Sequence, residues 1–98
     1  MIFTKDEAVR QIIESLKSIS PVAGDVVITL DLNPLESLAL DSGDGVEFAL
    51  DIEDRLAIKI PMEVNPLVKD GAIPRARTVG EIADFLTELA AKHGETQK

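Results

Sequence analysis

The chain has 98 residues, of which 45% are hydrophobic and three are aromatic, so we expect one small folded domain spanning residues 1–98 with an aliphatic core. Eighteen acidic and ten basic side chains give a net charge of −8, which disfavours binding to nucleic acid phosphates. With no cysteine and one histidine, His93, the sequence offers no disulfide, no protein thiol and no parts for a metal site.

The first part of the chain predicts one helix followed by a long connection. Thr4 and Glu7 form a capping-box pattern, and apolar residues then recur at helical spacing up to Ile19. Residues 26–30 have strand propensity, but we find no second strand in the sequence that could pair with them. We therefore expect residues 21–41 to form a loop whose apolar side chains pack on the helices.

A second helix is expected over residues 42–56. Gly43 and Gly45 are poor helix formers, but their place in the first turn makes this less costly. Glu53 falls on the apolar side of the helix and interrupts an otherwise amphipathic pattern. On the other side, four acidic residues fall within an arc of about 80°, and they are Asp44, Glu47, Asp51 and Asp54.

The last third of the chain predicts a second loop and a final helix. Residues 61–77 contain several prolines, and we expect a short helical turn there at most. Thr78 and Glu81 repeat the capping-box pattern, and an apolar stripe follows up to Ala90. The tail from about His93 is expected to be disordered. The sequence thus predicts an all-α fold, a bundle of three to four helices with a long first loop.

The pair Asp41 and Ser42 stands at the expected start of the second helix. Both residue types are favoured at helix N-termini, so capping alone would explain them. A serine at this position also lies beside N–H groups that have no partner within the helix, and the helix dipole favours a phosphate there. The residues alone leave both roles open, and the two roles are compatible.

The order of motifs along the chain resembles that of acyl carrier proteins. In that family an Asp-Ser pair begins the second helix, an acidic helix and an Ile-Pro step follow, and a Thr-Val step starts the last helix. The matching residues here are Leu38-Ala39-Leu40-Asp41-Ser42, Asp44, Val46-Glu47-Phe48, Ile52-Glu53-Asp54, Ile60-Pro61 and Thr78-Val79. The resemblance extends from the first helix to about Leu89 and implies a helical bundle of the acyl-carrier type.

The resemblance also implies a function for Ser42. This residue would accept 4′-phosphopantetheine from coenzyme A through a separate Mg²⁺-dependent transferase, with Asp41 beside it as the adjacent motif residue. The thiol would hold acyl intermediates as thioesters for partner enzymes in fatty acid, lipid or specialised-metabolite biosynthesis, and the protein itself would not be an enzyme. The helices would shelter the acyl chain, for which the candidates by position are Val46, Leu50, Leu56, Ile60 and Ile82.

The resemblance further implies how partners would recognise the chain. The docking face for basic surfaces of the transferase and of acyl-processing enzymes would consist of Asp44, Glu47, Asp51 and Asp54. Two departures from the family, Gly43 in place of the usual Leu or Met and a longer segment 61–77, indicate a specialised carrier. No apolar run approaches the roughly 18 residues of a membrane span, and the start lacks a signal-peptide pattern, so we expect a cytoplasmic protein. We also expect it to be a monomer.

Other functions compete with the carrier interpretation. An acidic helical bundle could dock on a basic partner without ever being modified, and Gly43 keeps this alternative open. A hydrolase built on Ser42 is disfavoured, because the chain has no Gly-x-Ser-x-Gly elbow and its only histidine is near the end. For a carrier, an acyl cargo comes first and an aminoacyl or polyketide cargo second.

Overall fold

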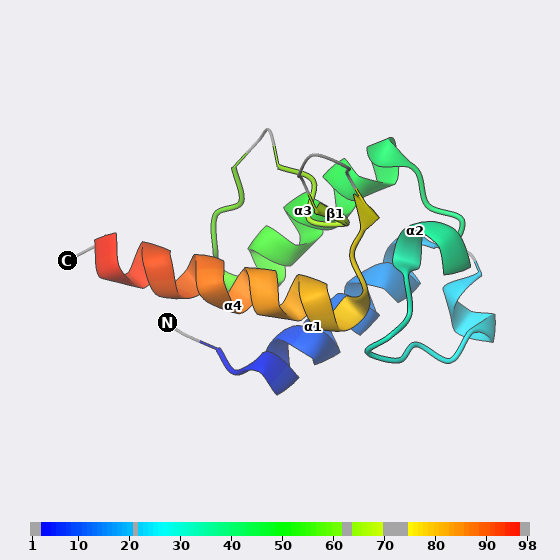
Figure 1. The fold of residues 1–98 in the computed structure, drawn as a ribbon, viewed down its shortest axis with the longest axis horizontal. Helices are drawn as coiled ribbons and strands as arrows, with labels where there is room; N and C mark the ends of the chain where they lie inside the picture. The colour runs from blue at the N-terminus through cyan, green and yellow to red at the C-terminus, as the bar shows by residue number, and fades with distance from the viewer. Residues whose placement is uncertain (1–2, 21, 62–63, 70–74, 97–98) are drawn as a thin grey trace.

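The structure is a computed structural model, and the residues that it describes are 3–20, 22–61, 64–69 and 75–96. Its main body consists of three long helices (Figure 1), which are α1 (Lys5–Ile19), α3 (Ser42–Leu56) and α4 (Val79–Thr96). α1 packs against both α3 and α4 and so joins the other two helices. The expected all-α bundle is confirmed, since each strand in the described part of the chain spans only two residues.

The first helix begins and ends with contacts that its sequence supplies. Thr4 Oγ1 accepts a hydrogen bond from the Glu7 N–H at 3.1 Å, so Thr4 caps the helix, while the Glu7 carboxylate pairs with Arg10 instead of completing the expected capping box. At the other end, the backbone N–H of Ser20 donates to Leu16 O at 2.9 Å. The buried Ser20 hydroxyl donates to Leu38 O at 3.1 Å, which ties the end of α1 to the segment that leads into α3.

The core is aliphatic and surrounds a single buried ring, that of Phe48. Helices and loops both contribute to it, and the buried members are Ala8, Ile12, Leu16, Leu38, Leu40, Phe48, Ile52, Leu56, Ile60, Leu67, Val79, Ile82, Ala83 and Leu86. Burial of one such large side chain stabilises a fold by roughly 1.5–3 kcal/mol. The buried loop residues Leu38, Leu40, Ile60 and Leu67 therefore hold the two loops firmly against the helices.

The first loop covers the start of α4. Residues 26–29 take no regular secondary structure, as expected. The Val79 N–H donates to Leu32 O and the Gly80 N–H to Leu30 O, each at 2.9 Å. These bonds satisfy two of the N–H groups that a helix leaves without a partner at its N-terminus. A Cβ at Gly80 would lie 3.3 Å from Leu30 O, so glycine permits this close approach.

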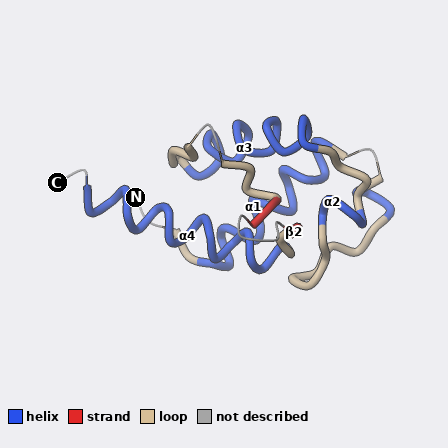
Figure 2. The backbone as a smooth tube through the Cα atoms, turned by 45° about the horizontal axis from the view of Figure 1, so that its top comes forward, coloured by secondary structure: helices blue, strands red, loops and turns tan. Residues whose placement is uncertain are grey.

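The short elements in the two loops differ from the prediction. Where we expected a helical turn at most within 61–77, β1 (Val68–Lys69) pairs antiparallel with β2 (Arg75–Ala76), drawn in red in Figure 2. Strands of two residues contain too few positions for an alternating pattern, so no signal for them is visible in the sequence. A short helix, α2 (Pro34–Ser37), lies instead in the first loop, after a 3-10 turn at Ala23–Asp25.

The last helix starts with the predicted capping box. The Thr78 N–H donates to Glu81 Oε1 at 3.0 Å, and the Glu81 N–H donates to Thr78 Oγ1 at 3.3 Å. α4 is described to Thr96, beyond residue 93, where we expected the ordered part to end. Side chains after Lys92 lie outside those that the structure describes.

Candidate functional site

The first turn of α3 is closed by two aspartates that cap each other. The Asp44 N–H donates to Asp41 Oδ1 at 2.9 Å, and the Asp41 N–H donates to Asp44 Oδ2 at 3.0 Å. Ser42 is the first residue of the helix, so its backbone lies at the positive end of the helix dipole. The Ser42 side chain is outside those that the structure describes, while its neighbours Asp41 and Gly43 are exposed.

The turn before Asp41 is fixed by two buried leucines. Ala39 has a φ of 53°, in the left-handed region that is costly for a residue with a Cβ. This conformation lets Leu38 and Leu40, which are 1% and 9% exposed, both enter the core. The Leu40 N–H also donates to Leu35 O at 3.2 Å. The position of the Asp-Ser pair on the bundle is therefore set by core packing immediately before it.

A second loop approaches α3 one turn after Ser42. A Cβ at Gly45 would lie only 2.6 Å from both Oδ1 and Nδ2 of Asn65, closer than real Cβ contacts come, so a larger residue would push the Asn65 side chain away. Asn65 is held there because its Oδ1 accepts the Leu67 N–H at 2.9 Å. From the sequence, Gly45 could be recognised only as a weak helix former. The structure explains why glycine stands here, because the side chain of Asn65 packs against it.

Of the four acidic candidates, Asp51 faces α1 rather than the outside. Its Oδ2 accepts a hydrogen bond from Arg55 Nε at 2.8 Å, and Arg55 Nη1 donates to Gln11 Oε1 of α1 at 3.3 Å. Partial burial alone would raise the pKa of Asp51, but the nearby Ser15 hydroxyl and Arg55 outweigh it, and the pKa is lowered overall. The buried Ser15 hydroxyl has no partner of standard hydrogen-bond geometry among the described residues.

The outer face of α3 is partly apolar and partly acidic. Val46 and Leu50 are each 62% exposed there, with Glu47 and Asp54 exposed beside them. The interior position that we expected for Val46 and Leu50 is wrong. Each lies two residues, or roughly 160° around the helix, from a residue such as Phe48 that points into the core. Asp44, the remaining acidic candidate, is half-buried in the cap described above.

The other three pocket candidates do lie in the core. Leu56 and Ile60 are each 7% exposed and Ile82 is fully buried. Ile60 is held by Glu53, whose Oε2 accepts the Ile60 N–H at 2.6 Å. The glutamate that interrupts the apolar pattern of α3 therefore has a structural reason, because it satisfies a backbone group beyond the end of the helix. Ala57, with a φ of 54°, makes the left-handed turn between them.

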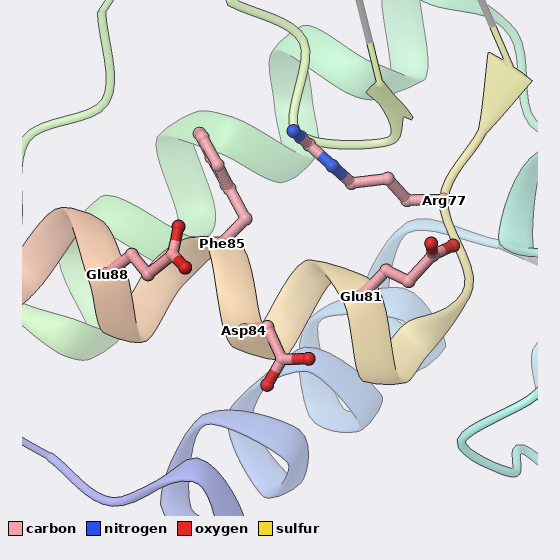
Figure 3. Close-up of a pocket in the computed structure, with 5 residues that line it drawn as sticks. All are labelled: Arg77, Glu81, Asp84, Phe85 and Glu88. Carbon is pink, nitrogen blue, oxygen red and sulfur yellow. The ribbon is translucent and has the colours of Figure 1, made fainter.

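A separate surface hollow of about 230 Å³ lies on α4, as Figure 3 shows, lined by Arg77, Glu81, Asp84, Phe85 and Glu88. The Arg77 guanidinium carbon lies 4.2 Å from the centre of the Phe85 ring, a cation–π contact. Asp84 forms an ion pair with Lys5 of α1 at 3.0 Å. These contacts account for Arg77 and Asp84 without a ligand.

Glu81 at the rim of this hollow has a structural function as well. It accepts from Arg75 Nη1 at 3.0 Å and from the Thr78 N–H at 3.0 Å. The hydrogen bond from Arg75, with the Thr78 N–H as a second donor, lowers the pKa of Glu81 from its ordinary value of 4.5 to about 2. Glu81 thus links the β2 strand to the start of α4.

Two further features of the described residues bear on function. They contain no group of three or more histidine, aspartate or glutamate side chains placed to hold a metal ion. No helix among them is both long enough and apolar enough to pass through a membrane.

Comparison with known proteins relates the whole chain to a carrier protein. The chain is similar to an acyl carrier protein of Rhodococcus erythropolis, with 29% identity over 100 aligned residues that cover 99% of this chain and 97% of that protein. No protein-family model and no solved structure matches the chain. The similarity extends over the whole length, so it includes the first turn of α3 and the loops before and after this helix.

Proposed function

We propose that the chain is an acyl carrier protein that holds 4′-phosphopantetheine on Ser42. The observation that carries this proposal is the position of Ser42 as the first residue of a 15-residue helix, directly after the exposed N-cap Asp41. The full-length similarity to an acyl carrier protein and the small helical bundle support it.

The first turn of α3 is chemically suited to a phosphodiester. Its surroundings are open, because Asp41 and Gly43 on either side of Ser42 are exposed. The positive end of the helix dipole stabilises an exposed anion by about 0.3–1 kcal/mol. The negative charges of Asp41 and Asp44 would repel a phosphate, but both carboxylates accept hydrogen bonds from backbone N–H groups of the cap. When bound, the group supplies a thiol, which this cysteine-free chain lacks.

In this proposal the chain presents an acyl thioester and catalyses nothing itself. The partners are a phosphopantetheinyl transferase and acyl-processing enzymes with basic surfaces, in fatty acid, lipid or specialised-metabolite synthesis. Glu47 and Asp54 are the acidic contacts for them, because both are exposed on the outer face of α3, with Val46 and Leu50 as apolar contacts beside them. Asp51 contributes less to docking, since Arg55 already pairs with it.

A carrier of this kind would shelter its acyl chain among core residues of the bundle. Leu56, Ile60 and Ile82 are the candidates, since all three are buried in one cluster. Entry of a chain requires the aliphatic side chains to move apart, which costs contacts in a close-packed interior. The cargo therefore competes with the core of the bundle.

The test is the intact mass of the protein before and after incubation with a broad-specificity phosphopantetheinyl transferase, coenzyme A and Mg²⁺. We expect a gain of one phosphopantetheine on the wild type and on Ser18→Ala, a matched control because Ser18 is exposed on α1. Ser42→Ala should remain folded, because alanine is a good helix former, and should gain nothing. If Ser42→Ala is modified, the group is attached at another residue and the proposal is contradicted. If the folded wild type is not modified beside a modified control carrier, the proposal is also contradicted, and an unmodified docking module is favoured.

A further inference from the structure

We propose that Asn65 positions the prosthetic group by donating hydrogen bonds to its phosphate at Ser42, and that Gly45 is glycine in order to admit Asn65. The inference rests on the proposed function of Ser42. The observation that supports it is the contact between Asn65 of the second loop and Gly45 of α3. The cap of α3 forms without this contact, because Asp41 and Asp44 make it by themselves.

The geometry brings the Asn65 amide to the side of α3 on which Ser42 lies. Both amide atoms of Asn65 are 2.6 Å from the position that a Gly45 Cβ would take, so the amide occupies the place of a side chain at residue 45. Helical residues three apart share a face, with about 5–6 Å between their Cβ positions. The Asn65 amide therefore lies on the face of α3 that residue 42 shares, one helical turn away, and in the proposal it donates to the oxygens of a phosphate bound at Ser42.

The amide is oriented with its donors available. Asn65 Oδ1 accepts the Leu67 N–H at 2.9 Å, which fixes which end of the amide is oxygen. The Nδ2 group carries two N–H donors, and no described residue accepts a hydrogen bond from it. Phosphodiester oxygens only accept, and hydrogen bonds to a charged acceptor are about twice as strong as neutral ones. The donors of Asn65 and the acceptors of the group are therefore complementary.

The loop that carries Asn65 is held in place by the protein alone. Asn65 O accepts the Val68 N–H at 3.0 Å, and the next two residues, Pro66 and Leu67, are fully buried. Arg77 also holds this segment in place. Its backbone N–H donates to Leu67 O at 2.8 Å, and its Nη1 donates to Pro66 O at 3.2 Å. Little side-chain entropy remains to be lost when Asn65 binds an anion.

The test is nuclear magnetic resonance of the side-chain amides in the unmodified and the modified protein. The chain has two asparagines, so Asn33, which caps α2, is an internal control. We expect the Nδ2 signals of Asn65 to shift when Ser42 is modified, while those of Asn33 stay unchanged. Equal or no shifts at the two asparagines overturn the inference. Intact mass is measured on the same samples, so failure of modification is distinguished from failure of this contact.

A matched variant separates positioning from structure. Asn65→Asp keeps an oxygen that accepts the Leu67 N–H but removes both donors, so the loop is retained and the contact with phosphate is lost. We expect its phosphorus-31 signal to move towards that of unfolded modified protein, while backbone signals of α3 and β1 are unchanged. Gly45→Ala should have the same effect on phosphorus, because its Cβ displaces Asn65. A wild-type phosphorus signal in both variants overturns the inference.

Discussion

Replacement of Glu53 by alanine should destabilise the fold markedly. The same replacement at the next residue, Asp54, should have little effect, because Asp54 is exposed. Glu53 Oε2 accepts the Ile60 N–H at 2.6 Å, and Ile60 is only 7% exposed. The variant loses a hydrogen bond to a charged group, worth about 1.5–3 kcal/mol, and leaves a poorly hydrated donor without a partner. Better helix propensity returns only a few tenths of a kcal/mol. We therefore expect a loss of about 2 kcal/mol in the free energy of unfolding.

The assay is urea denaturation followed by far-ultraviolet circular dichroism, since the chain has no tryptophan or tyrosine to report by fluorescence. In a domain of this size, about 2 kcal/mol corresponds to a fall in Tm of roughly 8–16 °C. Glu53→Gln keeps an acceptor and should lose less than half as much. Asp54→Ala should stay within about 0.5 kcal/mol of the wild type. If Glu53→Ala is as stable as Asp54→Ala, the hydrogen bond to Ile60 does not hold the end of α3.

Three further predictions concern a helix end, a titrating group and the docking face. Ala57→Gly should raise the free energy of unfolding by about 0.5–1 kcal/mol in the same urea assay, because glycine adopts the φ of 54° found there without strain. Glu81 has a folded pKa of about 2, below its ordinary 4.5, so its contribution to stability is present above about pH 4.5 and is lost as the pH falls towards 2. The difference in Tm between wild type and Glu81→Gln should therefore shrink over that range, and a constant difference contradicts the assignment. Glu47→Lys and Asp54→Lys should slow modification by the transferase severalfold at low salt, whereas Glu14→Lys, exposed on α1, should not, as measured by initial rates of mass gain.

The long helices could be predicted because their signals are local. The expected span of residues 42–56 agrees with α3, the capping box at Thr78 forms with both of its hydrogen bonds, and at Thr4 the hydroxyl half of the expected box forms. Each depends on residues within four positions of one another, so a pattern along the chain contains the whole interaction. The same locality explains why Asp41 and Ser42 could be placed at a helix start from the order of residues alone.

Features that depend on distant residues could not be read in this way. Glu53 and Gly45 both look like defects in an amphipathic helix, yet each serves a partner beyond the end of α3, Ile60 and Asn65 respectively. Val46 and Leu50 were expected on the apolar side of α3 and as pocket candidates, but both are 62% exposed, because the core occupies only the part of that side around Phe48 and Ile52. At Glu53 and Gly45, tertiary contacts overrode local preference.

If the chain is a carrier, Ser42 holds the prosthetic group in the cell. The most direct measurement is mass spectrometry of the peptide that contains Ser42, from protein isolated from its own organism without added transferase. We expect a phosphopantetheine on Ser42, with or without an acyl group on its thiol. A Ser42 peptide that is quantitatively unmodified would contradict it.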